Sequence, residues 1–436
     1  FLEGLKAVEP NQLLEKHFVI EKNKIIVSDI DENSKKYYLD EFEKVYIIGA
    51  GKAAAAMAYK IEEIFEDRIT SGTVVTKYGF GEELKVIQLI EAGHPSPDEN
   101  GVLAASRIKD ICTDATEKDL IISLISGGAS ALLTVPVEGI SLEEIILTSK
   151  VLLNSRATIS EMNTVRKHIS KIKGGQLMQV AYPATVISLI ISDVIGDDPS
   201  IIGSGLFVYD DSTFSDCLNI LKKYDLINIV PSSVLQYLSE GKNKIRLETP
   251  TEQDQIFSNS DSFIIGNNLI CLKHILDAAH QMGYNSKILN TELSGEAKQV
   301  GAYIISDAAN FLEHGAEVGK KYCLIYGGET TVSVLGPGKG GRNQEMVLSA
   351  ALQVSGHNGI SMLSCGSDGD DGPTDAAGAY CDWTTIQRGK KLNMNAERYL
   401  SENDSYNYFK KLDDLIITGP TKTNVMDIQI VLIDPS

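Results

Sequence analysis

Short apolar runs alternate with longer amphipathic segments along most of the chain. The run at 120–125 is apolar at nearly every position, and the runs at 45–48 and 185–191 are similar, as expected for parallel strands covered on both faces. Segments such as 53–65 and 102–115 instead place their apolar residues at helical spacing. Repeated alternation of strand and helix predicts an α/β protein with mostly parallel sheets.

A length of 436 residues exceeds what one ordinary core organises, so the chain is expected to form two domains. The polar stretch 239–254, which contains Gly241 and Pro250, is the best boundary. We therefore predict a Rossmann-like N-terminal domain over residues 1–250 and a C-terminal α/β domain over residues 251–436, with an approximate boundary that the chain can cross back over.

The net charge of -19 narrows the classes of partner. Nucleic acids and anionic membrane surfaces attract clustered Lys and Arg, so neither is an expected partner. The six cysteines are scattered without a Cys-x-x-Cys pair, which indicates reduced thiols in a cytoplasmic protein. The sequence shows no signal peptide and no long apolar span.

Five apolar runs end in loops of small or polar residues, and ligands of open α/β sheets bind beyond the carboxyl ends of strands. These loops are Gly49–Lys52, Ser126–Ser130, Ser192-Asp193, Gly327–Thr330 and the acidic segment Ser364–Gly378. Five such loops are hard to explain as tight turns alone, so they predict a ligand site.

The acidic segment carries Asp368, Asp370, Asp371 and Asp375 among four glycines and a proline. A packed core would not tolerate unpaired carboxylates, whereas a site for magnesium or a phosphate-bearing substrate uses oxygen ligands from flexible loops. The alternative is a solvated turn that is merely acidic.

The segment Gly49-x-Gly51-x-x-Ala54 matches the dinucleotide fingerprint formally. The second strand, however, ends at Thr76-Lys77, without the carboxylate that binds a ribose. The Walker phosphate loop fails as well, because Ala53 stands in place of the required hydroxyl. Backbone N–H groups at the helix start, together with Lys52, can still hold an anion; otherwise Lys52 lies on a solvated first turn.

Two further loops offer binding groups. In the first, Ser126–Ser130, the glycines let a ligand approach closely, and the absence of Gly-x-Ser-x-Gly argues against a serine hydrolase. In the second, Arg342 and Asn343 stand at a helix start, where a guanidinium can clamp a carboxylate or phosphate at two points. The alternative for the second loop is a flexible glycine segment with Asn343 as the helix cap.

Taken together and in this order, eight segments of the chain resemble the class II glycerate kinases, the family with the C-terminal MOFRL domain. The resemblance runs from about Val45 to the end, and Arg156 and Leu206 depart from the usual glycine and proline. The segments are Gly49-Ala50-Gly51-Lys52-Ala53, Gly93-His94-Pro95-Ser96-Pro97, Ser126-Gly127-Gly128-Ala129-Ser130-Ala131-Leu132, Asn163–His168 with Lys173-Gly174-Gly175, Ser192–Asp198, Gly327-Gly328-Glu329-Thr330, Gly341-Arg342-Asn343-Gln344-Glu345 and Asp368–Asp375.

The resemblance implies two α/β domains facing each other across a cleft, the second of MOFRL type. It also implies ATP-dependent phosphorylation of D-glycerate to 2-phosphoglycerate, with Mg²⁺ or another divalent cation, by a monomer or homodimer. Lys52 and Arg342 match residues thought to act in the family's active site. A hydroxypyruvate or related 2-hydroxy-acid reductase and a non-catalytic small-anion binding protein remain as alternatives.

Phosphoryl transfer needs positioning and charge neutralisation, which assigns expected roles. Lys52 would neutralise the transferring phosphoryl group, and Arg342 would bind either that group or the glycerate carboxylate. Asp193 would be a metal ligand or the base, and Asp368 with Asp371 or Asp375 would complete the metal shell. The expected binding residues are Gly49, Gly51, Ser126, Gly127, Gly128, Ala129, Ser130, Glu329 and Asn343.

Overall fold

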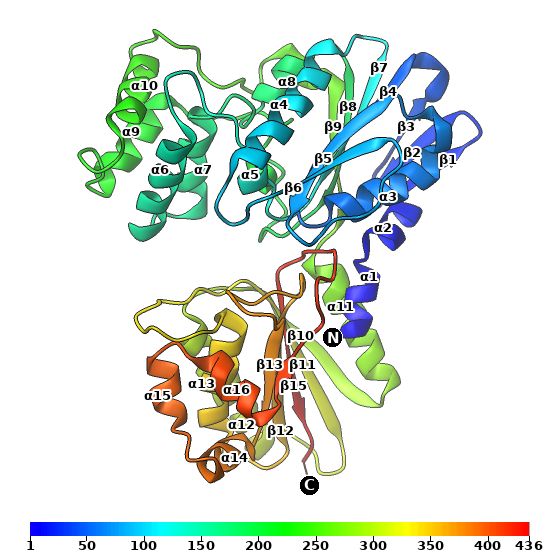
Figure 1. Ribbon diagram of the computed structural model, residues 1–436. Helices are drawn as coiled ribbons and strands as arrows, with labels where there is room; N and C mark the ends of the chain where they lie inside the picture. Colours follow the sequence, from blue (N-terminus) through cyan, green and yellow to red (C-terminus); the bar gives the residue numbers. More distant parts are fainter. Residues whose placement is uncertain (436) are drawn as a thin grey trace. The chain divides into compact units, whose positions relative to one another are not determined.

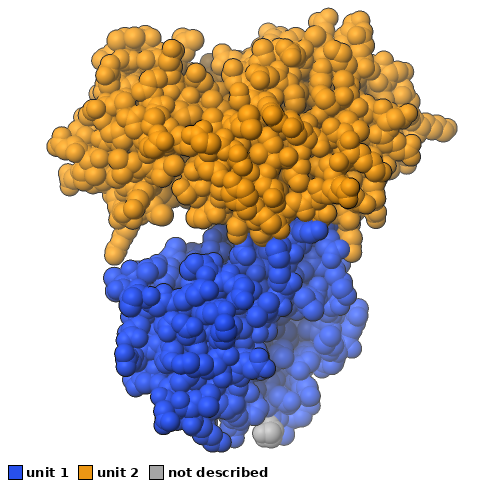
Figure 2. Space-filling model, viewed as in Figure 1, with its two compact units in different colours: residues 1–9, 267–436 blue, residues 10–266 orange. Residues whose placement is uncertain are grey.

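The computed structural model describes residues 1–435 and divides into two compact units (Figure 2). Residues 10–266 form one unit, called here the N-terminal unit. Residues 1–9 together with residues 267–436 form the other, called the C-terminal unit. Both units combine a six-stranded sheet with helices, so the predicted α/β class is confirmed (Figure 1).

The sheet of the N-terminal unit is entirely parallel, as predicted. Its strand order is β6-β5-β4-β7-β8-β9, and β9 joins the sheet although it follows the polar stretch 239–254. The strands are β4 (Lys44–Ala50), β5 (Ser71–Lys77), β6 (Ile87–Ala92), β7 (Asp119–Ile125), β8 (Thr185–Ile191) and β9 (Ser260–Gly266).

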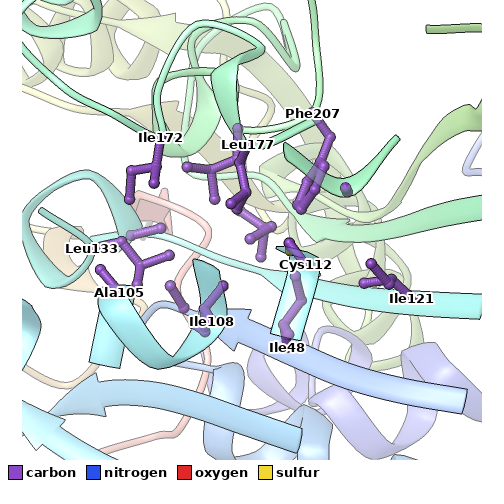
Figure 3. Close-up of a cluster of buried hydrophobic side chains, with 14 of the residues drawn as sticks. Ile48, Ala105, Ile108, Cys112, Ile121, Leu133, Ile172, Leu177 and Phe207 are labelled. Atoms are coloured by element: carbon purple, nitrogen blue, oxygen red, sulfur yellow. The ribbon is translucent and has the colours of Figure 1, made fainter. Parts of the chain in front are cut away.

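Every residue of β7 is buried, because helices cover both faces of this sheet. On one face, α4 (Glu99–Asp114) and α8 (Gln176–Ala181) pack against the strands. Figure 3 shows Ile108 and Leu177 from these helices and Ile48 of β4 among the side chains of one buried cluster. Helix α3 (Ala54–Phe65) contacts β4, β5 and β7 but adds no residue to that cluster, so it covers the other face.

A separate group of helices in this unit surrounds its own apolar core, which includes Ile145, Val165 and Phe214 (Figure 1). These helices are α6 (Leu142–Asn154), α7 (Ile159–His168), α9 (Phe214–Lys223) and α10 (Ser232–Lys242). The remaining elements are α2 (Pro10–His17), α5 (Ala129–Leu132), short 3-10 turns, and an antiparallel sheet of β1 (Phe18–Glu21), β2 (Lys24–Ser28) and β3 (Ser34–Tyr38).

The sheet of the C-terminal unit is not mostly parallel, and that part of the prediction is wrong. Its order is β10-β11-β15-β12-β13-β14, in which only β10 and β11 pair in parallel. A loop rather than a crossover helix joins β12 to β13, which permits antiparallel pairing. The strands are β10 (Tyr284–Leu293), β11 (Lys321–Gly328), β12 (Ile360–Gly366), β13 (Gly378–Asp382), β14 (Leu415–Ile416) and β15 (Asp427–Ile433).

Helices α12 and α13 pack together and share an apolar cluster with the strands of this sheet. The first helix, α1, packs on α11, where Gly4 approaches Ile275 closely. Among the described residues, no helix is long and apolar enough to cross a membrane. The helices are α1 (Leu2–Ala7), α11 (Asn268–Gln281), α12 (Ala297–His314), α13 (Arg342–Val354), α14 (Thr385–Lys391), α15 (Ala396–Ser401) and α16 (Ser405–Leu412).

Candidate functional site

The carboxyl ends of β4 and β7 bring two of the predicted loops into contact. The Lys52 N–H donates to the Gly127 carbonyl at 2.9 Å, and the Ala53 N–H donates to Ser126 Oγ at 2.9 Å. Gly51 has φ +130, and a Cβ there would lie only 2.2 Å from Ser126 Oγ, so glycine is required. The Lys52 side chain, 9% exposed, is therefore held against the Ser126–Ser130 loop.

Backbone N–H groups at the start of α3 already donate to acceptors within the protein. The Gly51 N–H donates to the Val75 carbonyl and the Ala54 N–H to the Gly51 carbonyl. A Cβ on Gly49 would meet the Leu124 carbonyl oxygen at 2.7 Å, so this glycine permits close packing of β4 on β7. Gly49 and Gly51 thus permit the close packing of this loop and strand on Leu124 and Ser126.

The Ser126–Ser130 loop differs in its backbone hydrogen bonding. Within residues 1–435, the N–H groups of Gly127 and Gly128 have no protein acceptor. Ala129 and Ser130 begin α5, and the Ser130 hydroxyl lies 2.6 Å from Ser204 Oγ. These two glycine N–H groups are therefore among the backbone donors that this loop can offer an anion.

A cavity of about 210 Å³ opens beside this loop, lined by Gly128, Ser130, His94, Arg166 and Lys173 among other residues. Lys173 Nζ donates to the carbonyls of Ser130 and Leu133, at 2.8 and 2.7 Å. Burial and the nearby charge of Arg166 lower the pKa of Lys173 to about 7. Neither cation is among the residues predicted to form the site, although the segments Asn163–His168 and Lys173-Gly174-Gly175 are among those that carry the resemblance.

Asp193 follows β8 at the same edge of the sheet, because the parallel strands all end there. Its side chain is half-buried, and the preceding Ser192 is fully buried. The structure thus gathers Lys52, Asp193 and the Ser126–Ser130 loop around the carboxyl ends of three neighbouring strands.

In the C-terminal unit, Arg342 is the first residue of α13 and makes the two-point contact that its residue type allows. Its Nε and Nη2 donate to the two carboxylate oxygens of Asp427, at 2.6 and 2.9 Å. Its Nη1 lies 2.9 Å from Glu329 Oε1. Although burial alone would lower it, these carboxylates hold the pKa of Arg342 above its ordinary value.

Asp427 was not identified from the sequence, although it is the first residue of β15 and fully buried. The available signal was a lone carboxylate that opens an apolar strand. Its register opposite Gly328 of β11 and Gly366 of β12 places it between the loops that follow those two strands.

Asp371 of the acidic segment acts as the cap of α13. Its two carboxylate oxygens accept the backbone N–H groups of Asn343 and Gln344, at 3.0 and 2.8 Å. Burial raises the pKa of Asp371 to about 7, against the opposing effect of those two N–H groups. Asn343 is buried as well and accepts a hydrogen bond from Ser364, so both residues support the helix start that carries Arg342.

The other two predicted acidic ligands lie in different surroundings. Asp368 is buried and accepts the N–H of Asp370 at 3.0 Å, whereas Asp375 is exposed and accepts the Tyr406 hydroxyl at 2.7 Å. Across residues 1–435, no three His, Cys, Asp or Glu side chains are grouped so as to hold a metal ion.

Two family models match the chain. One is described as a domain of unknown function, DUF4147, and matches residues 1–239. The other is the MOFRL family, which matches residues 322–427. The second match contains the Arg342–Asp427 pair and the acidic segment.

The chain is also similar to named proteins along nearly its whole length. It is 42% identical to "Glycerate 2-kinase" of Pyrococcus horikoshii, over 99% of this chain and 95% of the relative. It is 42% identical to a protein of Agrobacterium vitis provisionally named a hydroxypyruvate reductase, over 89% and 98%. The crystal structure of "Glycerate kinase" from Thermotoga maritima matches with a TM-score of 0.80 and 37% identity, over 99% and 97%.

Proposed function

Because this chain belongs to the glycerate 2-kinase family, we propose that it transfers the terminal phosphoryl group of ATP to the 2-hydroxyl of D-glycerate. The observation that carries the proposal is the match to "Glycerate 2-kinase" over nearly the full length of both chains. The dinucleotide alternative is disfavoured, because Lys77 ends β5 where a dinucleotide-binding sheet places its ribose-binding carboxylate.

Lys52 is the proposed electrostatic partner of the transferring phosphoryl group. It is nearly buried beside a loop with two unsatisfied N–H groups, those of Gly127 and Gly128. Preorganised donors in a site with little water stabilise developing charge far better than donors that must reorganise. We assign the phosphate oxygens of ATP to these N–H groups.

The magnesium ion of the reaction would be held with the nucleotide rather than in an all-protein cage. Mg²⁺ commonly binds through one or two carboxylates plus substrate phosphates, and it neutralises their charge. Asp193 is the proposed carboxylate, because it follows β8 at the sheet edge that also carries Lys52 and the Ser126–Ser130 loop. If it does not bind the metal, Asp193 is the proposed base for the attacking hydroxyl.

Arg342 is held by Asp427 and Glu329, yet a guanidinium has five N–H donors and these contacts use three. We propose that its remaining N–H groups bind an oxygen of the reacting molecules. Fixing the guanidinium on a buried carboxylate removes the entropy cost of orienting it.

The function is tested by adding D-glycerate and ATP with Mg²⁺ to the pure protein and measuring ADP. The product is then incubated with enolase alone. Direct formation of phosphoenolpyruvate identifies 2-phosphoglycerate, whereas a strict need for phosphoglycerate mutase identifies the 3-phosphate. Absence of ADP, together with NADH oxidation in the presence of hydroxypyruvate, would replace the proposal with the reductase.

A further inference from the structure

Arg166 is a half-buried cation that has no anionic partner among the described residues. It lies on α7, lines the cavity beside the Ser126–Ser130 loop, and is half-buried. Within residues 1–435, its guanidinium makes no hydrogen bond or ion pair. Burial lowers the pKa of Arg166, the direction expected where no carboxylate lies beside a guanidinium.

Two other partly buried arginines of this protein are paired with carboxylates. Arg342 and Arg388, with side chains 32% and 33% exposed, each make a two-point contact with a fully buried aspartate. Such pairing offsets the cost of removing a guanidinium from water. A protein with a net charge of -19 has carboxylates in excess, so the lack of one at Arg166 calls for a different anion.

Lys173 adds a second positive group to the same cavity. It is 4% exposed, and its ammonium donates to two backbone carbonyls that fix the adjoining loop. None of the described residues that line the cavity is an aspartate or glutamate. Two neighbouring cations facing a cavity without a carboxylate repel each other, and a bound anion would relieve this repulsion.

The size and position of the cavity narrow the choice of anion. A volume of about 210 Å³ suits a three-carbon acid and is below the range of pockets that enclose larger ligands, roughly 300 Å³ and above. One wall is Gly128, and a Cβ built there would lie 3.7 Å from Lys52 Cγ. The cavity therefore begins beside the lysine assigned to phosphoryl transfer.

We propose that this cavity binds the carboxylate of the hydroxy-acid substrate through Arg166, with the substrate's hydroxyl groups directed toward Gly128 and Lys52. The inference rests on the proposed function, because the substrate class comes from there. A planar guanidinium matches a carboxylate at two points, which explains selection of an acid over a neutral polyol.

The first test is binding by isothermal titration calorimetry, with D-glycerate and ATP titrated separately. Losing a charge-assisted contact should weaken D-glycerate binding about 10-fold in Arg166→Lys and about 100-fold in Arg166→Met. ATP binding should be unchanged in both variants. The matched control is Arg68→Lys, which alters an exposed arginine of the same unit and should bind both ligands as the unaltered protein does.

The second test compares D-glycerate with its neutral amide as phosphoryl acceptor. The unaltered enzyme should prefer the acid strongly, and Arg166→Met should lose most of that preference through a higher KM for the acid. Lost ATP affinity with unchanged glycerate affinity would overturn the proposal in favour of a phosphate site. Unchanged affinity for both would overturn it outright.

A third measurement does not depend on the variants folding. An experimental structure of the unaltered protein with D-glycerate should show the carboxylate at Arg166, and a carboxylate bound elsewhere would reject the assignment. Failure of the proposed function is distinguishable, because the unaltered protein would then form no ADP from ATP and D-glycerate, whatever Arg166 binds.

Discussion

Both units place polar loops at the ends of buried strands, but they differ in whether a buried cation is paired with a carboxylate of the protein. In the C-terminal unit, Arg342 is neutralised by Asp427 and Glu329, and Asp371 caps α13. In the N-terminal unit, the cavity beside the Ser126–Ser130 loop holds Arg166 and Lys173 without any lining carboxylate. The first arrangement builds a framework, and the second leaves positive charge for a ligand.

The physical basis of the contrast is the cost of burying charge. A buried ion pair with good geometry balances that cost within the protein, and losing one partner exposes the full penalty. A buried cation with no carboxylate beside it carries an uncompensated desolvation cost in the free protein, and binding of an anionic ligand offsets that cost.

Removing the framework carboxylate should affect stability most. Asp427→Ala leaves the Arg342 guanidinium without its two-point partner, so we expect the free energy of unfolding to fall by about 3–5 kcal/mol. Urea denaturation measures this change. Asp434→Ala, which removes an exposed partner of Lys321, is the control and should cost less than about 1 kcal/mol. Equal losses in the two variants would show that Arg342 is not a framework group.

Removing the lysine proposed to act on the phosphoryl group should affect catalysis instead. Lys52→Ala should lower turnover at least ~100-fold, about 2.7 kcal/mol, because one preorganised charge is gone. Steady-state assays measure the loss, and circular dichroism should be unchanged. Lys36→Ala on an exposed strand position serves as the control. Turnover close to that of the unaltered enzyme would remove Lys52 from the reaction.

Arg342 belongs to the framework and to the proposed reaction, so a conservative change should separate the two. Arg342→Lys keeps the charge and loses the planar contact, so kcat/KM should fall about 10-fold. Arg388→Lys disrupts the same kind of pair, with Asp414, in the same unit and should change only stability. If both variants are kinetically silent, Arg342 is structural alone.

The smallest expected signal is proton uptake at Lys173. Burial and the charge of Arg166 lower its pKa to about 7 in the free protein, so Lys173 is largely neutral at pH 8. A carboxylate bound in the cavity favours the charged form and raises this pKa, so D-glycerate binding at pH 8 should take up a fraction of a proton. Calorimetry in buffers of different ionisation enthalpy measures the uptake. Equal apparent enthalpies in all buffers would mean that no anion binds near Lys173.

The sequence by itself determined much of this picture. Apolar periodicity is a local property, so it predicted strands such as β7 and the loops at their ends, and the ordered motifs indicated the family now supported by near full-length relatives. Parallel strands end at one edge, so the pattern also placed the loops Gly49–Lys52 and Ser126–Ser130 at the ligand-binding edge of a sheet, while the pairing of β4 with β7 that brings them into contact came from the structure.

Only the tertiary structure decided which charges meet. Strand β15 inserts between β11 and β12 and brings Asp427 to Arg342, 85 residues away in the chain. Asp371 reaches back to cap α13, and Arg166 on α7 meets a cavity formed by distant loops. A period of two or 3.6 residues reports which face of an element is buried, but it carries no information about partners across the fold. Whether a cation is neutralised by the protein or left for a ligand depends on those non-local contacts.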